Sequence, residues 1–347
     1  MTHHTTAVLL VNLGSPDSYT PKDLRQYLDE FLMDRYVIDL PYLLRTLLVK
    51  GIILNTRPKK SAAAYKSIWW DEGSPLIVLS KRLQKALTKR CPYPVGLGMR
   101  YANPSIKDGI AELLKQHPKI NDIILLPLYP HYAMATTLTV LEKTREVLRQ
   151  FYPGLRCRYI PPFYKDPLYI SALASSIKRA VNIEEIDHLL FSFHGIPERH
   201  VKKTDPTRAH CMRVNNCCYS PSTAHQQCYS HHVHYSAQLC AREAGIPDSL
   251  FSISFQSRLG LDRWLSPATD ERIVHLAKSG VKRLAILCPA FVSDCLETLE
   301  EIGEEAKESF LDHGGETFTL IPCLNTDQAF IDCLSRLIQD DALHMPI

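Results

Sequence analysis

The sequence lacks the short glycine-rich motifs that bind nucleotide phosphates. It contains no G-x-G-x-x-G fingerprint and no Walker A sequence, and only 14 of its 347 residues are glycine. A G-x-S-x-G nucleophile elbow is also absent. These absences disfavour a nucleotide-dependent enzyme and a serine hydrolase of the α/β-hydrolase type.

Long apolar runs are missing too. The most apolar long segment, Val37–Leu54, carries Asp39, Arg45 and Lys50 and is interrupted by Pro41. A membrane-spanning helix needs about 20 mostly apolar residues, so this segment is not predicted to be one.

Strong charge and an export signal are also lacking. The net charge is only +3, which is too small to indicate a nucleic-acid partner. No basic stretch precedes the apolar run Ala7–Leu13, so we predict no signal peptide and expect a cytoplasmic protein. The 11 cysteines are then expected to be reduced thiols or metal ligands rather than disulfides.

Short apolar segments recur along the chain, and each is followed by turn residues and a helical pattern. Such strands, alternating with helices, indicate parallel sheets that are covered on both faces. The predicted strands are Val8–Gly14, Val95–Arg100, Ile123–Leu128 and Arg158–Pro161 in the first half, and Leu189–Gly195, Phe251–Phe255, Leu284–Pro289 and Phe318–Pro322 in the second.

The two halves are similar in sequence. Five residues recur at a constant offset of 161, which indicates duplication: Ile160, Pro161, Asp166, Ile170 and Leu173 correspond to Ile321, Pro322, Asp327, Ile331 and Leu334. We therefore predict an α/β protein with two Rossmann-like domains, each with a four-stranded parallel sheet flanked by helices, and a cleft between them. The predicted domains are 1–165 and 166–323, and a C-terminal helix at about 324–341 is expected to pack back on the first.

Aromatic, basic and acidic side chains that could bind a ligand or take part in catalysis follow several predicted strands. Ligands of such sheets bind beyond the carboxyl ends of the strands. The aromatic, basic and acidic residues found there suit a flat, anionic, aromatic ligand; they are Arg100, Tyr101, His194, Arg258, Trp264 and Glu297.

Two of these features have alternative explanations at the level of single residues. His194 ends a strand, where a histidine is either a hydrogen-bonded structural residue or a functional imidazole. Glu297, Glu301 and Glu305 recur every four residues on a predicted helix. They form either a solvated acidic face or a ridge of carboxylates, whose mutual repulsion a hard divalent cation would relieve.

Four cysteines are clustered in a polar, turn-rich segment: Cys211, Cys217, Cys218 and Cys228. Five histidines accompany them at positions 210, 225, 231, 232 and 234. A structural zinc ion with mixed Cys and His ligands and a [2Fe–2S] cluster with four thiolates both fit this composition. The spacing is typical of neither site, and unbound thiols are the third possibility.

The motif Ser192–Arg199, with sequence SFHGIPER, resembles the signature of the ferrochelatases. Further segments resemble the same family in the same order, so that the resemblance covers roughly Val8 to Ile338. These segments are Leu10–Pro16, Phe31–Arg35, Gly73–Leu76, Leu126–Pro130, Phe255–Arg258, Trp264–Leu265 and Asp294–Leu299.

The resemblance implies an activity, namely insertion of Fe(II) into a porphyrin at the last step of haem synthesis, with protoporphyrin IX as substrate and protohaem as product. It implies that His194 is the catalytic histidine and Glu297 its partner carboxylate. Both, with Glu301 and Glu305 of the family's acidic ridge, would lie on the path of the iron. The porphyrin pocket would be lined by Arg57, Tyr65, Arg100, Tyr101 and Trp264.

This sequence differs from many members of the family at one position, and one of its segments resembles only some members. Cys295 stands where many relatives have a histidine. The segment 205–231 resembles an insertion that carries a [2Fe–2S] cluster in some bacterial members, which favours the cluster over zinc.

The apolar segment Phe31–Leu54 resembles the family's pocket lip and implies peripheral contact with the inner membrane. No feature requires a protein partner. A coproporphyrin ferrochelatase and a non-catalytic porphyrin or haem carrier stay open as alternatives.

Overall fold

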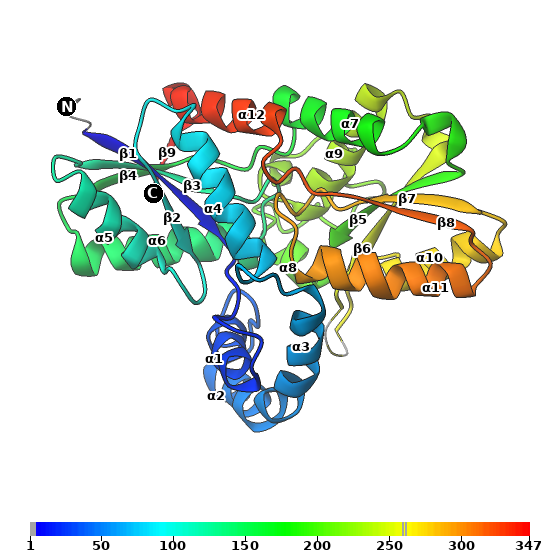
Figure 1. The fold of residues 1–347 in the computed structure, drawn as a ribbon, viewed down its shortest axis with the longest axis horizontal. Helices are drawn as coiled ribbons and strands as arrows, with labels where there is room; N and C mark the ends of the chain where they lie inside the picture. The colour runs from blue at the N-terminus through cyan, green and yellow to red at the C-terminus, as the bar shows by residue number, and fades with distance from the viewer. Residues whose placement is uncertain (1–4, 259, 261) are drawn as a thin grey trace. The chain divides into compact units, whose positions relative to one another are not determined.

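The computed structural model describes residues 5–258, 260 and 262–347, so the first four residues of the predicted first domain lie outside it. The chain forms two compact units (Figure 1). Unit 1 comprises residues 1–129, 134–162 and 331–347, and unit 2 comprises residues 130–133 and 163–330. Each unit is built around one sheet.

The sheet of unit 1 has the strand order β2-β1-β3-β4-β9. Its first four strands are parallel, and β9 pairs antiparallel with β4. The strands are β1 (Thr6–Asn12), β2 (Val95–Met99), β3 (Asp122–Pro127), β4 (Arg156–Tyr159) and β9 (Met345–Pro346).

The sheet of unit 2 repeats this arrangement. Its order is β6-β5-β7-β8, all parallel, so the first strand of each unit lies between its second and third. The prediction of two related four-stranded parallel sheets is therefore confirmed, and the short β9 is an addition to it. The strands of unit 2 are β5 (His188–His194), β6 (Phe251–Gln256), β7 (Arg283–Leu287) and β8 (Thr317–Ile321).

Apolar side chains cover both faces of the unit 1 sheet. Leu9 and Val11 of β1 pack with Ile110 of one helix and Val140 of another in one buried cluster. Leu10 points to the opposite face because side chains alternate along a strand, and it is also fully buried. This burial on both faces explains why the strand is continuously apolar in sequence.

The helices of unit 1 begin at recognisable signals. Ser105 caps α5 in a reciprocal capping box with Asp108, and Thr20 caps α1, which starts with Pro21. The helices are α1 (Pro21–Leu32), α2 (Tyr42–Thr46), the π-helix η1 (Leu47–Ile53), α3 (Leu54–Ile68), α4 (Pro75–Thr88), α5 (Ile106–Gln116), the π-helix η2 (Met134–Leu138), α6 (Thr139–Phe151), most of α12 (Gln328–Gln339) and η7 (Asp341–Leu343).

The helices of unit 2 also begin and end at recognisable capping residues. Asp166 caps α7, and Gly245, at φ +79°, ends α9 in the left-handed conformation that glycine adopts without strain. The helices are α7 (Pro167–Ala180), η3 (Ile183–Glu185), α8 (Glu198–Lys203), η4 (Thr223–Gln226), α9 (Tyr229–Ala244), η5 (Asp248–Leu250), α10 (Thr269–Lys278), the π-helix η6 (Glu297–Ala306) and α11 (Lys307–Asp312).

The acidic helix differs from the expectation of an ordinary α-helix. Residues Glu297–Ala306 form a π-helix, in which each turn is wider than in an α-helix. π-helical turns are rare and are found mostly at functional sites. Among the described residues, no helix is both long and apolar enough to cross a membrane.

Candidate active site

The end of β5 carries His194 and is joined to the end of β6. The Gly195 N–H donates to the Gln256 carbonyl at 2.7 Å. A Cβ atom at position 195 would lie 2.9 Å from that carbonyl oxygen, so the close approach of the two backbones requires glycine. The Gly in the His-Gly pair of the motif is explained by this contact.

The His194 ring has a defined orientation. Its Nδ1 lies 2.6 Å from the Gly195 carbonyl oxygen, which can only accept, so Nδ1 carries the hydrogen. When the ring is neutral, Nε2 is therefore the nitrogen that can accept a proton. The Tyr229 hydroxyl donates to the His194 carbonyl at 2.7 Å, and the Phe291 ring lies 6.2 Å from the imidazole, centroid to centroid. His194 is half-buried.

Glu301, one of the predicted acidic residues, is held by several donors. Its Oε1 accepts the Ser257 N–H at 2.8 Å, and its Oε2 accepts the Ser257 hydroxyl. Burial raises the pKa of Glu301 and the charge of Glu297 raises it too, whereas the hydrogen bonds from Ser257 and the charge of His194 lower it. Glu301 thus lies within electrostatic reach of both His194 and Glu297 in unit 2.

Glu297 has an unexpected neighbour in Cys295. The Cys295 thiol is hydrogen-bonded to the Glu297 side chain, and only 6% of Cys295 is exposed. Burial, above all, raises the pKa of this thiol well above its ordinary value, and Glu297 adds to the shift. Cys295 is therefore a neutral thiol beside a carboxylate.

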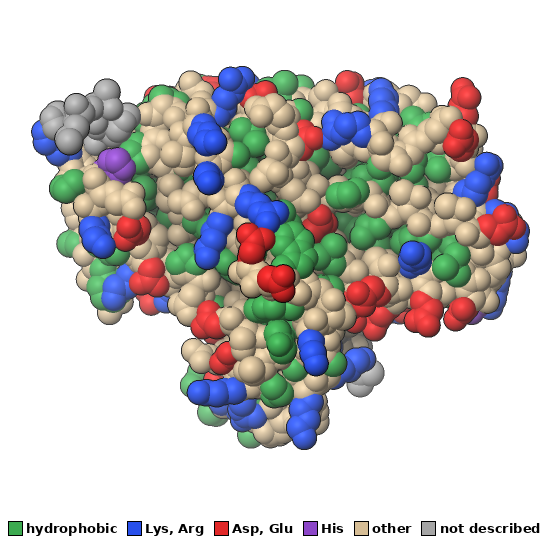
Figure 2. Space-filling model, viewed as in Figure 1, with side chains coloured by type: hydrophobic (Ala, Val, Ile, Leu, Met, Phe, Trp, Pro, Cys, Tyr) green, Lys and Arg blue, Asp and Glu red, His purple; other side chains and the backbone are tan. Residues whose placement is uncertain are grey.

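Glu305, the third acidic residue of the predicted ridge, is exposed. Figure 2 shows acidic side chains gathered along η6 and α11 on the face in view. Glu301 is half-buried and interacts with His194, whereas Glu305 lies four residues further along the π-helix at the surface.

Arg100 of unit 1 is engaged by a carboxylate that the sequence did not single out. Its guanidinium pairs with Asp34, and the two side chains are 12% and 4% exposed. Asp34 also accepts hydrogen bonds from the Tyr101 hydroxyl, at 2.9 Å, and from Thr139. The Arg100 guanidinium lies 4.3 Å from the centre of the Tyr101 ring, and Tyr101 is fully buried.

The three other predicted porphyrin-binding residues lie in different surroundings. Tyr65 is buried in α3, with its ring 6.1 Å from that of Trp69. Arg57 is exposed on the same helix. Trp264 of unit 2 is half-buried and pairs its backbone with Pro197 of the histidine motif.

The four clustered cysteines lie in pairs. The Cys211 and Cys228 thiols are hydrogen-bonded to each other, as are those of Cys217 and Cys218, and the charge of Cys228 acts on Cys218. Burial raises the pKa of Cys218, and the Cys211 contact raises that of Cys228. Within the described residues, no group of three or more His, Cys, Asp or Glu side chains is arranged so that it could hold a metal ion.

Imidazoles surround the backbone of this cysteine segment. Nε2 of His210 and Nε2 of His225 each lie 2.8 Å from the Cys217 carbonyl oxygen, and Nδ1 of His231 lies 2.6 Å from that of Cys218. These nitrogens act as donors, because a carbonyl oxygen can only accept. In this structure the three histidines thus order the loop that carries the thiols.

Asp205 fixes the start of the same segment. Its carboxylate accepts the His210 N–H at 2.9 Å, the Cys211 N–H at 2.8 Å and the hydroxyl of Thr207 at 2.7 Å. Burial raises the pKa of Asp205, but these hydrogen bonds outweigh it and hold the pKa far below its ordinary value. Asp205 thereby holds the backbone of the first turn of this polar segment, up to Cys211.

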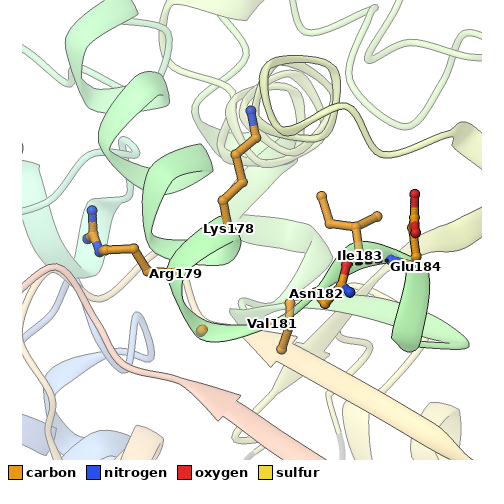
Figure 3. Close-up of a pocket in the computed structure, with 7 residues that line it drawn as sticks. Lys178, Arg179, Val181, Asn182, Ile183 and Glu184 are labelled. Atoms are coloured by element: carbon orange, nitrogen blue, oxygen red, sulfur yellow. Dashed lines mark hydrogen bonds between the residues drawn. The ribbon is translucent and has the colours of Figure 1, made fainter.

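A hollow at the end of α7 lies apart from these groups (Figure 3). It is lined by residues 178–184, which precede β5. It therefore lies at the amino end of β5, whereas His194 lies at the carboxyl end, and it contains none of the predicted site residues.

The fold is that of a chelatase. SirB from Bacillus subtilis, solved with Fe3+, matches with a TM-score of 0.55 and 13% identity, and the match covers 97% of this chain and 95% of that one. The sirohydrochlorin chelatase SirB from B. subtilis subspecies spizizenii, in complex with cobalt, matches with a TM-score of 0.53 and 12% identity over the same shares. At these identities the likeness shows the fold alone.

Comparison of the sequence with known proteins shows to which family of chelatases the chain belongs. The ferrochelatase family model matches residues 5–342. The chain is 49% identical over 340 residues to the ferrochelatase of Pseudomonas savastanoi pv. phaseolicola, with 98% of both chains covered. It is 50% identical over 339 residues to that of Azotobacter vinelandii, covering 97% of this chain and 98% of the relative. The chain belongs to the ferrochelatase family.

Proposed function

We propose that the protein inserts Fe(II) into protoporphyrin IX to give protohaem, a lyase-type reaction. The observation that carries the proposal is the His194 ring, whose Nδ1 is held by the Gly195 carbonyl and whose charge acts on the carboxylate of Glu301. Full-length relatives that are named ferrochelatase support the same reaction. Fe(II) and the porphyrin are substrates here.

The roles of the site residues follow from the chemistry of the macrocycle. Two pyrrole N–H protons must leave as the metal ion enters, and an imidazole suits this step because it exchanges protons near neutral pH. His194 Nε2 accepts such a proton in our proposal. The carboxylates of Glu297, Glu301 and Glu305 suit a hard divalent ion and provide its path, with Glu297 nearest to the chemistry.

The porphyrin contacts are proposed from the family resemblance and from the surroundings of each residue. Trp264 is half-buried and offers aromatic surface, whereas Tyr65 and Tyr101 are buried, so in our proposal they line the pocket from within the packed side chains around it. Arg57 is an exposed cation suited to a propionate. Arg100 is proposed to pair with a propionate as well. Since Asp34 already balances its charge, a propionate at Arg100 would share the guanidinium with Asp34.

Two other functions make different use of the same residues. A haem or porphyrin carrier needs the aromatic and basic contacts but no carboxylate that interacts with His194, so the interaction of Glu301 with His194 favours catalysis. A coproporphyrin ferrochelatase uses the same chemistry on a ring with more carboxylates.

We expect His194→Ala to lower the rate of iron insertion by about 10²- to 10⁴-fold, because the proton acceptor is lost. Porphyrin binding, measured by quenching of porphyrin fluorescence, is expected to stay close to the wild-type value. His275→Ala, which removes an imidazole on α10, serves as the control. Full turnover by His194→Ala would remove His194 from the mechanism.

We also propose that Cys211, Cys217, Cys218 and Cys228 hold a [2Fe–2S] cluster, with zinc as the alternative metal. Four thiolates are the ligand set of such a cluster, and the thiols lie in two contacting pairs, although among the described residues they are not brought together as a metal site in this structure. Such a cluster is a one-electron redox centre whose ligands also crosslink the chain. It would crosslink the loop between Asp205 and α9, in addition to the hydrogen bonds that already order it.

We expect Cys217→Ser to lose the visible absorption and the iron of the cluster and to melt at a lower temperature than the wild type. Cys240→Ser, which changes a fully buried cysteine of α9, is expected to retain the iron. Zinc in place of iron by metal analysis would favour the alternative metal. A Cys217→Ser protein with unchanged metal content and melting temperature would refute both sites.

A surface of unit 1 supports the expected peripheral contact with the membrane. Helices α2 and η1 expose large apolar side chains by more than half of their surface, and basic side chains lie on the neighbouring helix α3 (Figure 2). We propose that this surface rests on the lipid. The exposed residues are Tyr42, Leu43, Leu44, Leu47 and Ile52.

We expect the double variant Leu43→Ser/Leu47→Ser to sediment less with vesicles of phosphatidylethanolamine and phosphatidylglycerol than the wild type does, because it buries less apolar surface in them. Leu168→Ser, an equally polar change at an exposed leucine of unit 2, is the control. Equal sedimentation of all three proteins would exclude this surface as the contact.

A further inference from the structure

Ser257, directly after β6, has an unusual backbone conformation. Its φ is +64°, in the left-handed region that residues with a Cβ atom avoid. Glycine would adopt this conformation at no steric cost, so the backbone conformation does not account for the serine side chain at this position. Unfavourable backbone conformations of this kind are concentrated at functional sites.

In this conformation the backbone N–H and the side-chain hydroxyl of Ser257 both donate to the carboxylate of Glu301. The Ser257 N–H donates to Glu301 Oε1 at 2.8 Å, and the Ser257 hydroxyl donates to Glu301 Oε2. Both oxygens of Glu301 are therefore held by the same residue. A carboxylate held at both oxygens has lost the freedom to rotate about its last bond.

Gln256 completes the arrangement from the preceding position. It is 2% exposed, and its amide nitrogen donates to the Glu297 carbonyl at 2.9 Å and lies 3.4 Å from Glu301 Oε2. Its amide oxygen accepts the Ser192 hydroxyl at 2.7 Å. Ser257 thus projects from a backbone that is anchored to both β5 and η6.

We propose that Ser257 is a positioning residue that fixes the Glu301 carboxylate in the orientation in which it receives the divalent metal ion. The inference rests on the proposed function, because it assigns Glu301 to the path of the metal substrate. Each carboxylate oxygen has two lone pairs, so an oxygen that accepts from Ser257 can still coordinate a cation. A preset orientation spares the ordering of the side chain when the ion binds.

The test is a double-mutant cycle with Ser257→Gly, Ser257→Ala, Glu301→Gln and the two combined variants. Glycine removes the hydroxyl and relieves the backbone, whereas alanine removes the hydroxyl alone, so a defect common to both comes from the hydroxyl. Ser176→Ala, which removes a buried hydroxyl bonded to the Leu173 carbonyl in α7, is the control. Melting temperatures are recorded for every variant.

Two readouts are used. Co(II) is titrated without porphyrin and followed by its visible absorption, and initial rates of anaerobic Fe(II) insertion give KM for each substrate. We expect Ser257→Gly and Ser257→Ala to weaken Co(II) binding and to raise KM for Fe(II) by about tenfold, the effect of losing one hydrogen bond to a charged group. KM for porphyrin should not change. In the Glu301→Gln background the same substitutions should have no further effect.

The proposal is overturned if the Ser257 variants bind Co(II) like the wild type, or if they lose as much affinity in the Glu301→Gln background as in the wild-type background. It is also overturned if Ser176→Ala shows the same defect. If the proposed function is wrong, the wild-type protein itself does not insert iron, and this outcome differs from a defect confined to the Ser257 variants. The Co(II) titration still reports on Ser257 in that case.

Discussion

The hydrogen bonds of Gln256 are the constraint on which the arrangement of unit 2 depends. Its backbone carbonyl accepts the Gly195 N–H, its side-chain oxygen accepts the Ser192 hydroxyl, and its amide donates to the Glu297 carbonyl. One buried amide thus connects the strand that ends in His194 with the π-helix that carries the carboxylates. A buried polar group whose hydrogen bonds are all made rigidifies its surroundings, whereas one that lost a partner would be costly.

The two units have the same strand order, but the ends of their equivalent strands carry different functional residues. β2 and β6 are the second strands of their units and both pair with the first strand of the unit. The residues after β2 are Arg100 and Tyr101, held by Asp34, and the end of β6 carries Gln256, followed by Ser257. In both units the carboxyl end of this strand holds a carboxylate by hydrogen bonds, although the carboxylates come from different elements.

Much of the architecture could be predicted because it follows from local patterns. Strands buried on both faces are continuously apolar, which made β1, β3, β5 and β7 recognisable in the sequence, and His194 was noticed because it ends one of them. The strands at the sheet edges were located as well, although β4, with sequence RCRY, is only half-buried or exposed. β9 consists of only two residues, Met345 and Pro346, which carry no strand pattern.

The finer features of the site could not be predicted, because they depend on contacts distant in sequence or on backbone geometry. The π-helix has the same i+4 repeat of glutamates that an α-helix would show. Asp34 and Arg100 are 66 residues apart, and nothing in the sequence indicates their pairing. The positive φ of Ser257 leaves no mark in its residue type, because serine occurs in most turns.

The central claim is that the residues at these strand ends catalyse iron insertion, and wild-type turnover tests it most directly. Fe(II) and protoporphyrin IX are mixed anaerobically with the protein, and the conversion of free-base porphyrin absorption to that of haem is followed. The account predicts many turnovers per protein molecule, with protoporphyrin IX used faster than coproporphyrin. A spectral change that stops at one porphyrin per protein would contradict it and would identify a carrier.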